Sequence, residues 1–374
     1  MNENYRTLGD YIEIIDERNK GLAFDNLLGI SIAKKFIPSI ANIVGTDLSN
    51  YKIVRTGQFA YGPVTSRNGE KISIAFLDGD DCIISSSYTV FRVIKENELA
   101  PEYLMLWFSR PEFDRYARYK SHGSVREIFD WNEMCMVKLP VPDINKQRNI
   151  VKAYKAITDR IALKQKINDN LFDQAKTILR HLYDKEIHVG SLVSLNDFCT
   201  NAFSGGTPSR TIDEFWSSND VPWLKNGEIK NNVILSTEEY ISKEGLAGSS
   251  AKLVPQFTVN MAMYCVSDIQ VSLSYIPLST NQAVLNLIND SYRKACFVYY
   301  FLASFGNELT SQANGSAQQN LSKEKIVSYE FREPELDNNC FNFLEFNMNE
   351  RIRIAKEIVI LKEMQVALLS RLSY

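Results

Sequence analysis

The 374-residue chain is 45% hydrophobic, 23% charged and 11% aromatic, a composition typical of folded globular domains that excludes general disorder. Its length predicts two domains or more, each able to bury a core. The net charge of −3 and the pI near 5.8 argue against a protein that coats nucleic acid through bulk positive charge, so any DNA binding needs local basic patches or a partner.

The cysteines and the apolar segments indicate the compartment. No Cys-x-x-Cys pair occurs and only three histidines are present, so we expect reduced side chains without metal. The cysteines are Cys82, Cys135, Cys199, Cys265, Cys296 and Cys340. No apolar run approaches the roughly 20 residues of a membrane span, and the N-terminus MNENYRTLGDYIE has neither signal-peptide nor transit-peptide character. A cytoplasmic protein without membrane association is expected.

Residues 1–142 form the first predicted module. They contain short β-branched and aromatic runs, such as KISIAFL and CIISSSYTVFRVI, with turn residues between them. Such runs are typical of strands. We therefore predict a mainly β module with a few helices.

A long helix is predicted for residues 143–185. Leu139-Pro140-Val141-Pro142 cannot continue a helix and Asp143 is placed to cap the first turn. Residues spaced alternately by four and three then form a heptad seam, whose polar members Lys164 and Asn168 would fix register. The seam consists of Ile150, Tyr154, Ile157, Ile161, Lys164, Asn168, Leu171, Ala175, Ile178 and Leu182. Some forty residues at about 1.5 Å each span roughly 60 Å.

The same alternation recurs after a second module. Residues 190–335 contain strand-like runs such as SAKLVPQFTV and IPLSTNQAVLNLI, and a helix is predicted for residues 346–374. Its seam is Ile354, Ile358, Leu361, Gln365, Leu368 and Leu372. Two long amphipathic helices in one chain most economically pack antiparallel. The alternatives are that each belongs to its own domain or forms a homodimer. The predicted fold is α+β, with two mainly β modules alternating with two long helices in an antiparallel coiled coil.

The two modules also resemble each other. An offset of 192 residues places Gly123-Ser124 over Gly315-Ser316, Phe113 over Phe305, and Pro142 over Pro334. In both halves an aromatic helical run is followed by a Gly-Ser loop, a segment that ends at proline, and a long helix. The sequence therefore predicts one plan used twice.

This layout resembles the specificity subunit of type I restriction-modification enzymes, in which two target-recognition domains alternate with two helical spacers. Four short segments are similar to motifs that recur in that family: SGGTPS at 204–209, VPWLK at 221–225, SSAKLVP at 249–255 and TNQA at 280–283. Leu139-Pro140-Val141-Pro142 with Gln147-Arg148 looks like the entry to the central spacer. The distal spacer departs from the pattern, because residues 334–341 lack the proline-then-glutamine entry.

The resemblance implies a non-catalytic subunit that reads a split, asymmetric site on double-stranded DNA. It would deliver that site to DNA adenine methyltransferase subunits and to translocating restriction subunits. S-adenosylmethionine, ATP and Mg are then expected on those partners and no cofactor on this chain. The helices would separate the half-sites mechanically, since roughly 60 Å corresponds to about 18 base pairs.

The sequence itself carries no Asn/Asp-Pro-Pro-aromatic string, no Gly-x-Gly-x-x-Gly and no phosphate loop. The nearest nuclease-like pattern is Asp220 with Glu228 and Lys230, in a predicted loop. A stand-alone nuclease is therefore a remote alternative. Two others stay open: the equivalent subunit of a methylation-only or related restriction system, and a coiled-coil scaffold that binds only proteins.

Basic and aromatic residues interleave around the Gly-Ser loop of the first module, which suits phosphate anchoring and groove insertion. The candidates there are Arg110, Arg115, Arg118, Lys120 and Arg126. The alternative is a solvated helix face whose arginines pair with Glu112, Asp114 and Glu127. The turn PVTSRNGEK at residues 63–71 adds Arg67, Asn68 and Lys71 on a protruding tip.

In the second module the matching loop is rich in amides, which can pair with adenine edges but also occur in ordinary polar loops. Its candidates are Gln312, Asn314, Gln318, Gln319 and Asn320. Arg210, Lys225 and Asn226 are further predicted DNA contacts.

Overall fold

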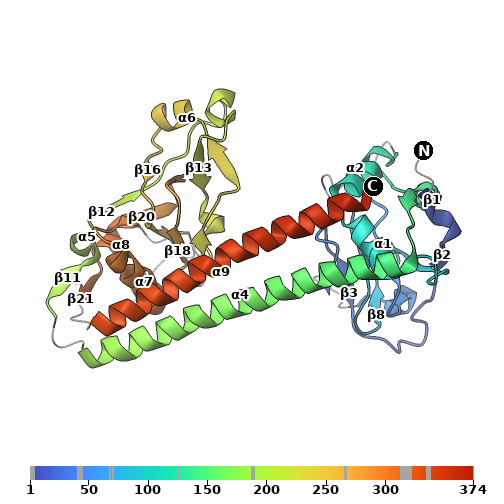
Figure 1. Ribbon diagram of the computed structural model, residues 1–374, viewed down its shortest axis with the longest axis horizontal. Helices are drawn as coiled ribbons and strands as arrows, with labels where there is room; N and C mark the ends of the chain where they lie inside the picture. The colour runs from blue at the N-terminus through green and yellow to red at the C-terminus, as the bar shows by residue number, and fades with distance from the viewer. Residues whose placement is uncertain are drawn as a thin grey trace. The chain divides into compact units, whose positions relative to one another are not determined.

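The computed structural model describes residues 5–39, 45–66, 69, 71–123, 126–186, 190–264, 268–311, 322–333 and 338–373. The chain divides into two compact units, residues 1–160 with 361–374, and residues 161–360. Each unit contains one sheet-rich domain and a part of each of two long helices, α4 and α9 (Figure 1).

The domain of the first unit is built on antiparallel strand pairs. Its four-stranded sheet has the order β2 (Ile12–Ile15), β9 (Thr89–Val93), β6 (Phe59–Tyr61), β7 (Ile74–Phe76). Two-stranded pairs join β1 (Tyr5–Thr7) to β10 (Lys138–Pro140), β3 (Leu28–Ile30) to β4 (Phe36–Pro38), and β5 (Lys52–Val54) to β8 (Cys82–Ile84). The helices are α1 (Pro101–Phe108), α2 (Pro111–Tyr119) and α3 (Trp131–Met136), with 3-10 turns at Leu8–Asp10 and Leu48–Asn50.

Aromatic side chains fill the core between that sheet and its helices. The Phe59 and Phe91 rings stack at 4.9 Å, and both meet Phe108 of α1 edge-on. The Phe113 ring of α2 lies 4.7 Å from that of Phe108. Burial of such side chains gives about 1.5–3 kcal/mol each, so the aromatic runs of residues 1–142 are what hold this domain together.

The second domain contains the sheet plan of the first, with further strands added. A five-stranded sheet has the order β12 (Asn201–Ser204), β20 (Val284–Ile288), β17 (Val259–Ala262), β18 (Val271–Ser274), β14 (Val233–Ile234). A four-stranded sheet has the order β15 (Glu239–Ile241), β13 (Val221–Leu224), β19 (Leu278–Thr280), β16 (Leu253–Val254). A pair joins β11 (Leu192–Ser194) to β21 (Glu330–Arg332). The order β12, β20, β17, β18 repeats the order β2, β9, β6, β7 of the first domain, with every pairing antiparallel in both, so the predicted repeat is confirmed. The parallel pairings of β14 with β18 and of β13 with β19 have no counterpart in the described sheets of the first domain.

One long helix completes the core of the second domain. It is α7 (Tyr292–Ser311), which packs on β17 and β18 and is buried along residues 295–302. The shorter helices are α5 (Leu195–Phe198), α6 (Lys243–Ala247) and α8 (Lys323–Val327), with 3-10 turns at Asp213–Trp216 and Asn226–Glu228. The near-continuous apolar run of α7 is typical of a helix that is covered on most sides.

The two long helices, α4 (Ile144–Glu186) and α9 (Asn338–Ser370, followed by a 3-10 turn at Arg371–Ser373), pair antiparallel. In the second unit Asn347 Nδ2 donates to Leu171 O at 2.9 Å, and Lys164 Nζ lies 2.6 Å from Glu357 Oε2. In the first unit Gln365 Nε2 donates to Thr158 Oγ1 at 2.7 Å. Residues nearer the N-terminus of α4 therefore contact residues nearer the C-terminus of α9, as expected for antiparallel helices. The predicted fold class is confirmed.

Every predicted seam position in both helices is buried or half-buried, while most of their neighbours are exposed. The predicted cap is also present, since Asp143 Oδ1 accepts from Asn145 N at 2.9 Å. Each polar seam residue has a partner in α9: Lys164 pairs with Glu357, and Asn168 accepts a bond from Arg351.

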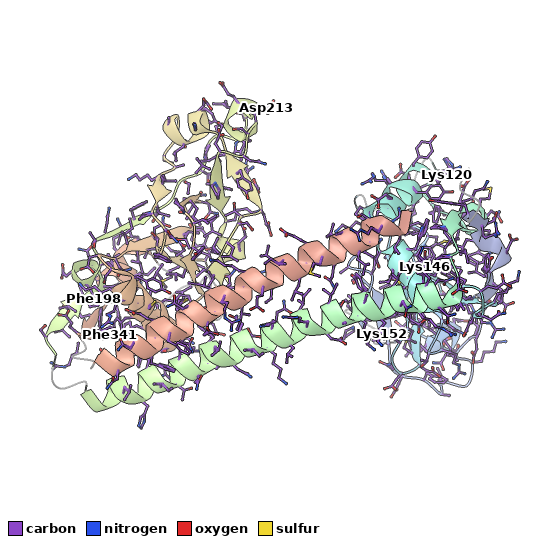
Figure 2. The ribbon with its side chains drawn as sticks, in the orientation of Figure 1. Lys120, Lys146, Lys152, Phe198, Asp213 and Phe341 are labelled. Atoms are coloured by element: carbon purple, nitrogen blue, oxygen red, sulfur yellow. The ribbon has the colours of Figure 1, made fainter. Side chains whose placement is uncertain are left out.

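The distal helix begins at Asn338, upstream of the predicted residue 346. Its first turns are held by apolar contacts with the second domain: Cys340 and Leu344 are buried, and the Phe341 ring lies 6.0 Å from that of Phe297. Figure 2 labels Phe341 near the start of the helix. The four-three spacing continues upstream from Ile354 through Arg351, Asn347, Leu344 and Cys340, all buried. The polar side chains of Asn347 and Arg351 hid this extension from the apolar pattern.

Candidate nucleic-acid interface

Most candidate cations of α2 in the first domain are already paired with carboxylates. Arg115 Nη2 lies 3.3 Å from Glu112, Lys120 Nζ lies 3.4 Å from Glu133, and Arg118 pairs with Glu127. These side chains are partly or well exposed, and such pairs contribute only about 0–1 kcal/mol each. A phosphate can therefore displace a carboxylate at small cost. Two of the three carboxylates named in the solvated-face alternative, Glu112 and Glu127, pair with arginines as that alternative predicts, whereas Asp114 pairs with Lys34.

Arg110 and Arg126 differ in exposure. Arg110 is 6% exposed, its guanidinium lies 5.2 Å from the centroid of Trp107, and its Nε is 3.4 Å from Glu112. This burial favours a structural role for Arg110 over contact with a DNA backbone. Arg126 is exposed and lies beside the Gly-Ser loop. Tyr119, at the end of α2, is 80% exposed, which is unusual for so large a ring and suits insertion into a groove.

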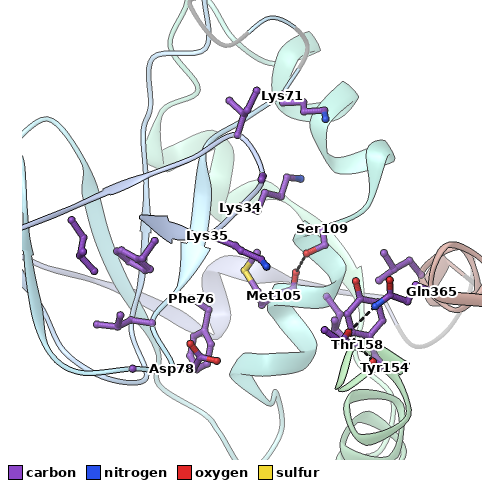
Figure 3. A pocket seen from close by; sticks show the side chains of 18 of the residues that line it. Lys34, Lys35, Lys71, Phe76, Asp78, Met105, Ser109, Tyr154, Thr158 and Gln365 are labelled. Atoms are coloured by element: carbon purple, nitrogen blue, oxygen red, sulfur yellow. Dashed lines mark hydrogen bonds between the residues drawn. The ribbon is translucent and has the colours of Figure 1, made fainter. Parts of the chain in front are cut away.

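A cleft of about 1050 Å³ opens on the first unit and is lined in part by Lys71, the last residue of the predicted turn. Lys34, Lys35 and Lys71 line one side, and Tyr154, Thr158 and Gln365 of the long helices line another (Figure 3). Arg67 and Asn68 lie outside the described residues. Lys71 thus contributes to a basic wall that the sequence did not reveal, because Lys34 and Lys35 are far from it in the chain.

Lys34 is the fixed member of that wall. It has a positive φ of 61°, and its ammonium lies 2.9 Å from Asp114 Oδ1 and 2.5 Å from Phe108 O. Burial lowers the pKa of the Lys34 ammonium. Asp114 Oδ1 also accepts from Ile72 N at 3.1 Å, so one carboxylate ties the β3–β4 hairpin and residue 72 to α2. A positive φ at a non-glycine residue such as Lys34 costs energy, and it persists where several surrounding contacts hold the backbone in that conformation.

The second domain places Arg210 and Lys225 around a single acidic pair. Arg210 Nη1 lies 2.6 Å from Glu239, and its guanidinium stacks 3.5 Å from the centroid of Trp216. Lys225 Nζ lies 2.8 Å from Glu238 and 3.0 Å from Glu239. The hydrogen bond from Arg210 holds the pKa of the Glu239 carboxyl below its usual value, and the bonds to Glu238 and Glu239 raise the pKa of Lys225. The structure brings these two predicted residues together.

The family-like strings of the second half meet beside this cluster. Trp223 Nε1 donates to Gly206 O at 3.0 Å, and Thr207 Oγ1 bonds to Gln282. A Cβ on Gly205 would lie 2.2 Å from Thr280 O, so no larger residue fits there. Asn226 is partly buried and donates to Tyr264 O at 3.1 Å. Tyr264 itself is 52% exposed and was not among the predicted residues.

The predicted amide loop of the second domain lies outside the described residues. Its members are Gln312, Asn314, Gln318, Gln319 and Asn320. Their contact with DNA stays a prediction.

The nuclease-like pattern is used for local structure. Asp220 Oδ2 accepts from Ser218 Oγ at 2.7 Å and from Lys243 N at 3.2 Å. Glu228 accepts from the backbone of Lys225 at 3.0 Å and of Glu238 at 2.9 Å. Both carboxylates therefore serve as backbone caps. Among the described residues no group of three or more His, Cys, Asp or Glu side chains is arranged to hold a metal ion.

Across the described part of the chain, no helix combines the length and the apolar character needed to cross a bilayer.

Gln147 attaches the first domain to the start of α4. It is fully buried, its Oε1 accepts from Ala100 N at 2.9 Å, and its Nε2 donates to Glu98 O and Pro142 O, both at 2.7 Å. The side-chain amide of Gln147 thus bonds to the N-cap residue of α1, to Glu98 just before that helix and to Pro142 just before α4. The sequence marked Gln147 only through its resemblance to a family motif.

Comparison with known proteins gives the family. The model of the type I restriction modification DNA specificity domain matches residues 5–172 and 191–345. The specificity subunit of the type I restriction enzyme EcoR124I/EcoR124II from Escherichia coli is 20% identical over 300 residues, covering 75% of this chain and 68% of the relative. The HindI specificity subunit from Haemophilus influenzae is 20% identical, covering 79% of this chain and 81% of the relative.

A solved structure shares the fold. The type I restriction-modification S subunit from M. genitalium superposes with a TM-score of 0.54 at 13% identity, covering 100% of this chain and 97% of that one. The family match covers both halves, each with its sheet-rich domain and adjoining helix. The chain belongs to the family of type I restriction-modification DNA specificity subunits.

Proposed function

We propose that this chain is the non-catalytic targeting subunit of a type I restriction-modification complex, and that it reads a bipartite, asymmetric DNA site. The observation that carries the proposal is a pair of sheet-rich domains that share a four-strand plan but differ in the strands added to it, each packed on its own part of one antiparallel helix pair. Two different readers on one chain address two different half-sites, whereas one module used twice by symmetry would address a palindrome.

The helices would set the gap between the half-sites. The 43 residues of α4 correspond to roughly 64 Å at about 1.5 Å per residue, or about 19 base pairs at roughly 3.4 Å each. The protein would then fix the number of base pairs in the gap without recognising their sequence.

The helix pair also offers a surface for methyltransferase subunits. In the second unit Leu163 and Ile167 of α4 are 58% and 38% exposed, and Ile360 of α9 is 56% exposed. In the first unit Met364 of α9 is 49% exposed. Large apolar residues at i, i+4 spacing outside a filled seam suit packing by further amphipathic helices. S-adenosylmethionine, and ATP with Mg, would be bound by the methyltransferase and translocating subunits respectively.

The docking surface has a direct test. Leu163→Glu is expected to weaken co-purification with the methyltransferase by about tenfold or more, because a carboxylate replaces apolar contact area. Lys166→Glu, at another exposed position of α4, is the matched control and should leave binding nearly unchanged. Equal binding by both variants would show that the methyltransferase docks elsewhere.

The recognition role is tested by mapping methylated adenines on genomic DNA from cells that express this chain with its methyltransferase. The expected result is one asymmetric motif in two parts with a constant gap, absent when this chain is deleted. A palindromic or continuous motif would overturn the proposal. No sequence-selective methylation, even with the methyltransferase present, would favour the protein-scaffold alternative instead.

A further inference from the structure

Arg351 lies in the middle of α9 with its whole side chain inside the second unit. It is 1% exposed and is among the largest fully buried side chains of the described chain. In that unit α9 runs between α4 and the sheet-rich domain (Figure 1), so a buried group on α9 can contact both. A buried cation at a seam position of α9 needs hydrogen-bond acceptors both from α4 and from the domain.

Three elements supply those acceptors. Arg351 Nε donates to Asn168 Oδ1 of α4 at 3.2 Å, Nη1 to the Tyr299 hydroxyl of α7 at 2.8 Å, and Nη2 to Asn231 O at 2.6 Å. The guanidinium also lies 4.8 Å from the ring centroid of Phe172 and 5.4 Å from that of Tyr299. We call Asn168, Asn231, Tyr299 and Arg351 the Arg351 cluster.

The charge of Arg351 is compensated without an anion. Within the described ranges no carboxylate lies at ion-pair distance from it. Burial raises the pKa of the Tyr299 phenol, so the hydroxyl keeps its proton and donates it to Asn231 O at 2.7 Å. Among the described residues, dipoles and ring faces therefore hold the cation, and they do so only in one geometry.

Asn231 adds backbone strain to this geometry. Its φ is +55°, its carbonyl accepts from both Arg351 and Tyr299, and its Oδ1 accepts from Val271 N at 3.1 Å. A non-glycine residue in this conformation persists because its surroundings over-determine it. The loop before β14 is thus fixed to α9 by Arg351.

A second chain of hydrogen bonds links the domain to α4 next to the Arg351 cluster. Tyr300 of α7 donates its hydroxyl proton to Asn347 Oδ1 at 2.6 Å, and Asn347 Nδ2 donates to Leu171 O of α4 at 2.9 Å. Again one polar residue of α9 joins the domain to α4. The pattern repeats at adjacent seam positions of the helix.

We infer that Arg351 is a positioning residue for DNA recognition: it fixes, at once, the register of α9 against α4 and the orientation of the second domain on both. A slip of one heptad would move Arg351 about 10 Å along α4 from Asn168 and strand a buried charge. A rotation of the domain would withdraw Tyr299 and Asn231. The inference rests on the proposed function, because it makes the gap depend on this one side chain.

The test compares Arg351→Met, which keeps an apolar stem, with Arg353→Met. Arg353 is exposed and pairs only with Glu350 and Glu357 of its own helix among the described residues. Tyr299→Phe, which keeps the ring and removes the hydroxyl, serves if Arg351→Met does not fold. Each variant is assembled with its methyltransferase and assayed on a library of the target in which the gap length varies.

Arg351→Met and Tyr299→Phe are expected to spread methylation over neighbouring gap lengths and to lower it about tenfold at the preferred gap. Arg353→Met should retain the single gap. Amide exchange at residues 229–233 should rise about tenfold or more in the first two variants only. A merely structural role would reduce methylation at all gaps equally, and that outcome, or unchanged exchange, overturns the inference. If the wild-type complex shows no preferred gap, the proposed spacing fails, while the exchange result still decides whether Arg351 holds the domain.

Discussion

The two recognition domains are attached to the helix pair by different chemistry. The first is held at the start of α4 by the neutral amide of Gln147, which bonds to three backbone groups. The second is held midway along α9 by Asn347 and by the charged side chain of Arg351, which bonds to two side chains and a strained carbonyl. An attachment at a helix start fixes where a domain sits, whereas an attachment between two helices also fixes how they are registered.

A consequence of this difference is that the helices can be lengthened between the attachments without disturbing either one. The positions after Arg160 and after Ile360 are where both helices pass from one unit to the other. They lie beyond Gln147 on one side and beyond Asn168 and Arg351 on the other. Insertions there test spacing alone.

Inserting three heptads at both positions is the change with the largest expected effect. It lengthens each helix by about 32 Å, or about nine base pairs, which is close to one turn of DNA and so keeps the half-sites near their original phase. Methylation mapping should show the same two half-sites with a gap about nine base pairs wider. The control inserts the heptads in α4 alone, which mismatches the seam and should abolish methylation. An unchanged gap with both insertions would show that the helices do not set the spacing.

Gln147→Ala should affect only the first unit. It leaves Ala100 N, Glu98 O and Pro142 O without partners in a buried site, and we expect a loss of about 2–3 kcal/mol in the free energy of unfolding of that unit. Native-state hydrogen exchange separates the units: β6 and β9 should lose protection, while β17 and β18 should not.

Gln365→Ala is the control for that variant, because Gln365 is half-buried and its one bond among the described residues is an exposed one to Thr158. Its expected cost is under about 1 kcal/mol. Equal loss of protection in both units of the Gln147→Ala protein would mean that the domains are not attached independently.

The sequence predicted the parts of this architecture that rest on periodic burial. The seam of α4 and the Asp143 cap follow from residue spacing and from a side chain that bonds to its own helix. The start of α9 did not follow, because Asn347 and Arg351 occupy seam positions as polar residues whose partners lie on α7 and α4. Long-range polar pairing leaves no periodic signal in one sequence.

The candidate DNA contacts were harder to predict for a related reason. Exposed cations can be named from sequence, but the carboxylates that neutralise Arg118, Arg210 and Lys225 come from other segments. The wall formed by Lys34, Lys35 and Lys71 likewise depends on how the β3–β4 hairpin folds onto α2. Burial and pairing of single side chains are properties of the tertiary structure.

Lys164→Leu is the smallest change that sharpens the comparison, because Lys164 is a polar seam residue with no role in either attachment. Its ammonium lies 2.6 Å from Glu357, and both side chains are partly exposed. Leucine would fill the seam, and Glu357 would keep its bond to Arg353 at 2.6 Å. Replacing such a pair by apolar contact is often neutral or stabilising, so we expect a gain of up to about 1 kcal/mol in the stability of the helix pair.

Thermal unfolding at low and high salt measures this gain: salt should lower the stability of the wild type and should not lower that of the variant. Lys166→Leu, on the exposed face, should give no gain. A loss of more than about 1 kcal/mol in Lys164→Leu would show that ionic pairing, and not apolar packing, holds this part of the coil, which would make the charge of Arg351 less exceptional than its burial indicates.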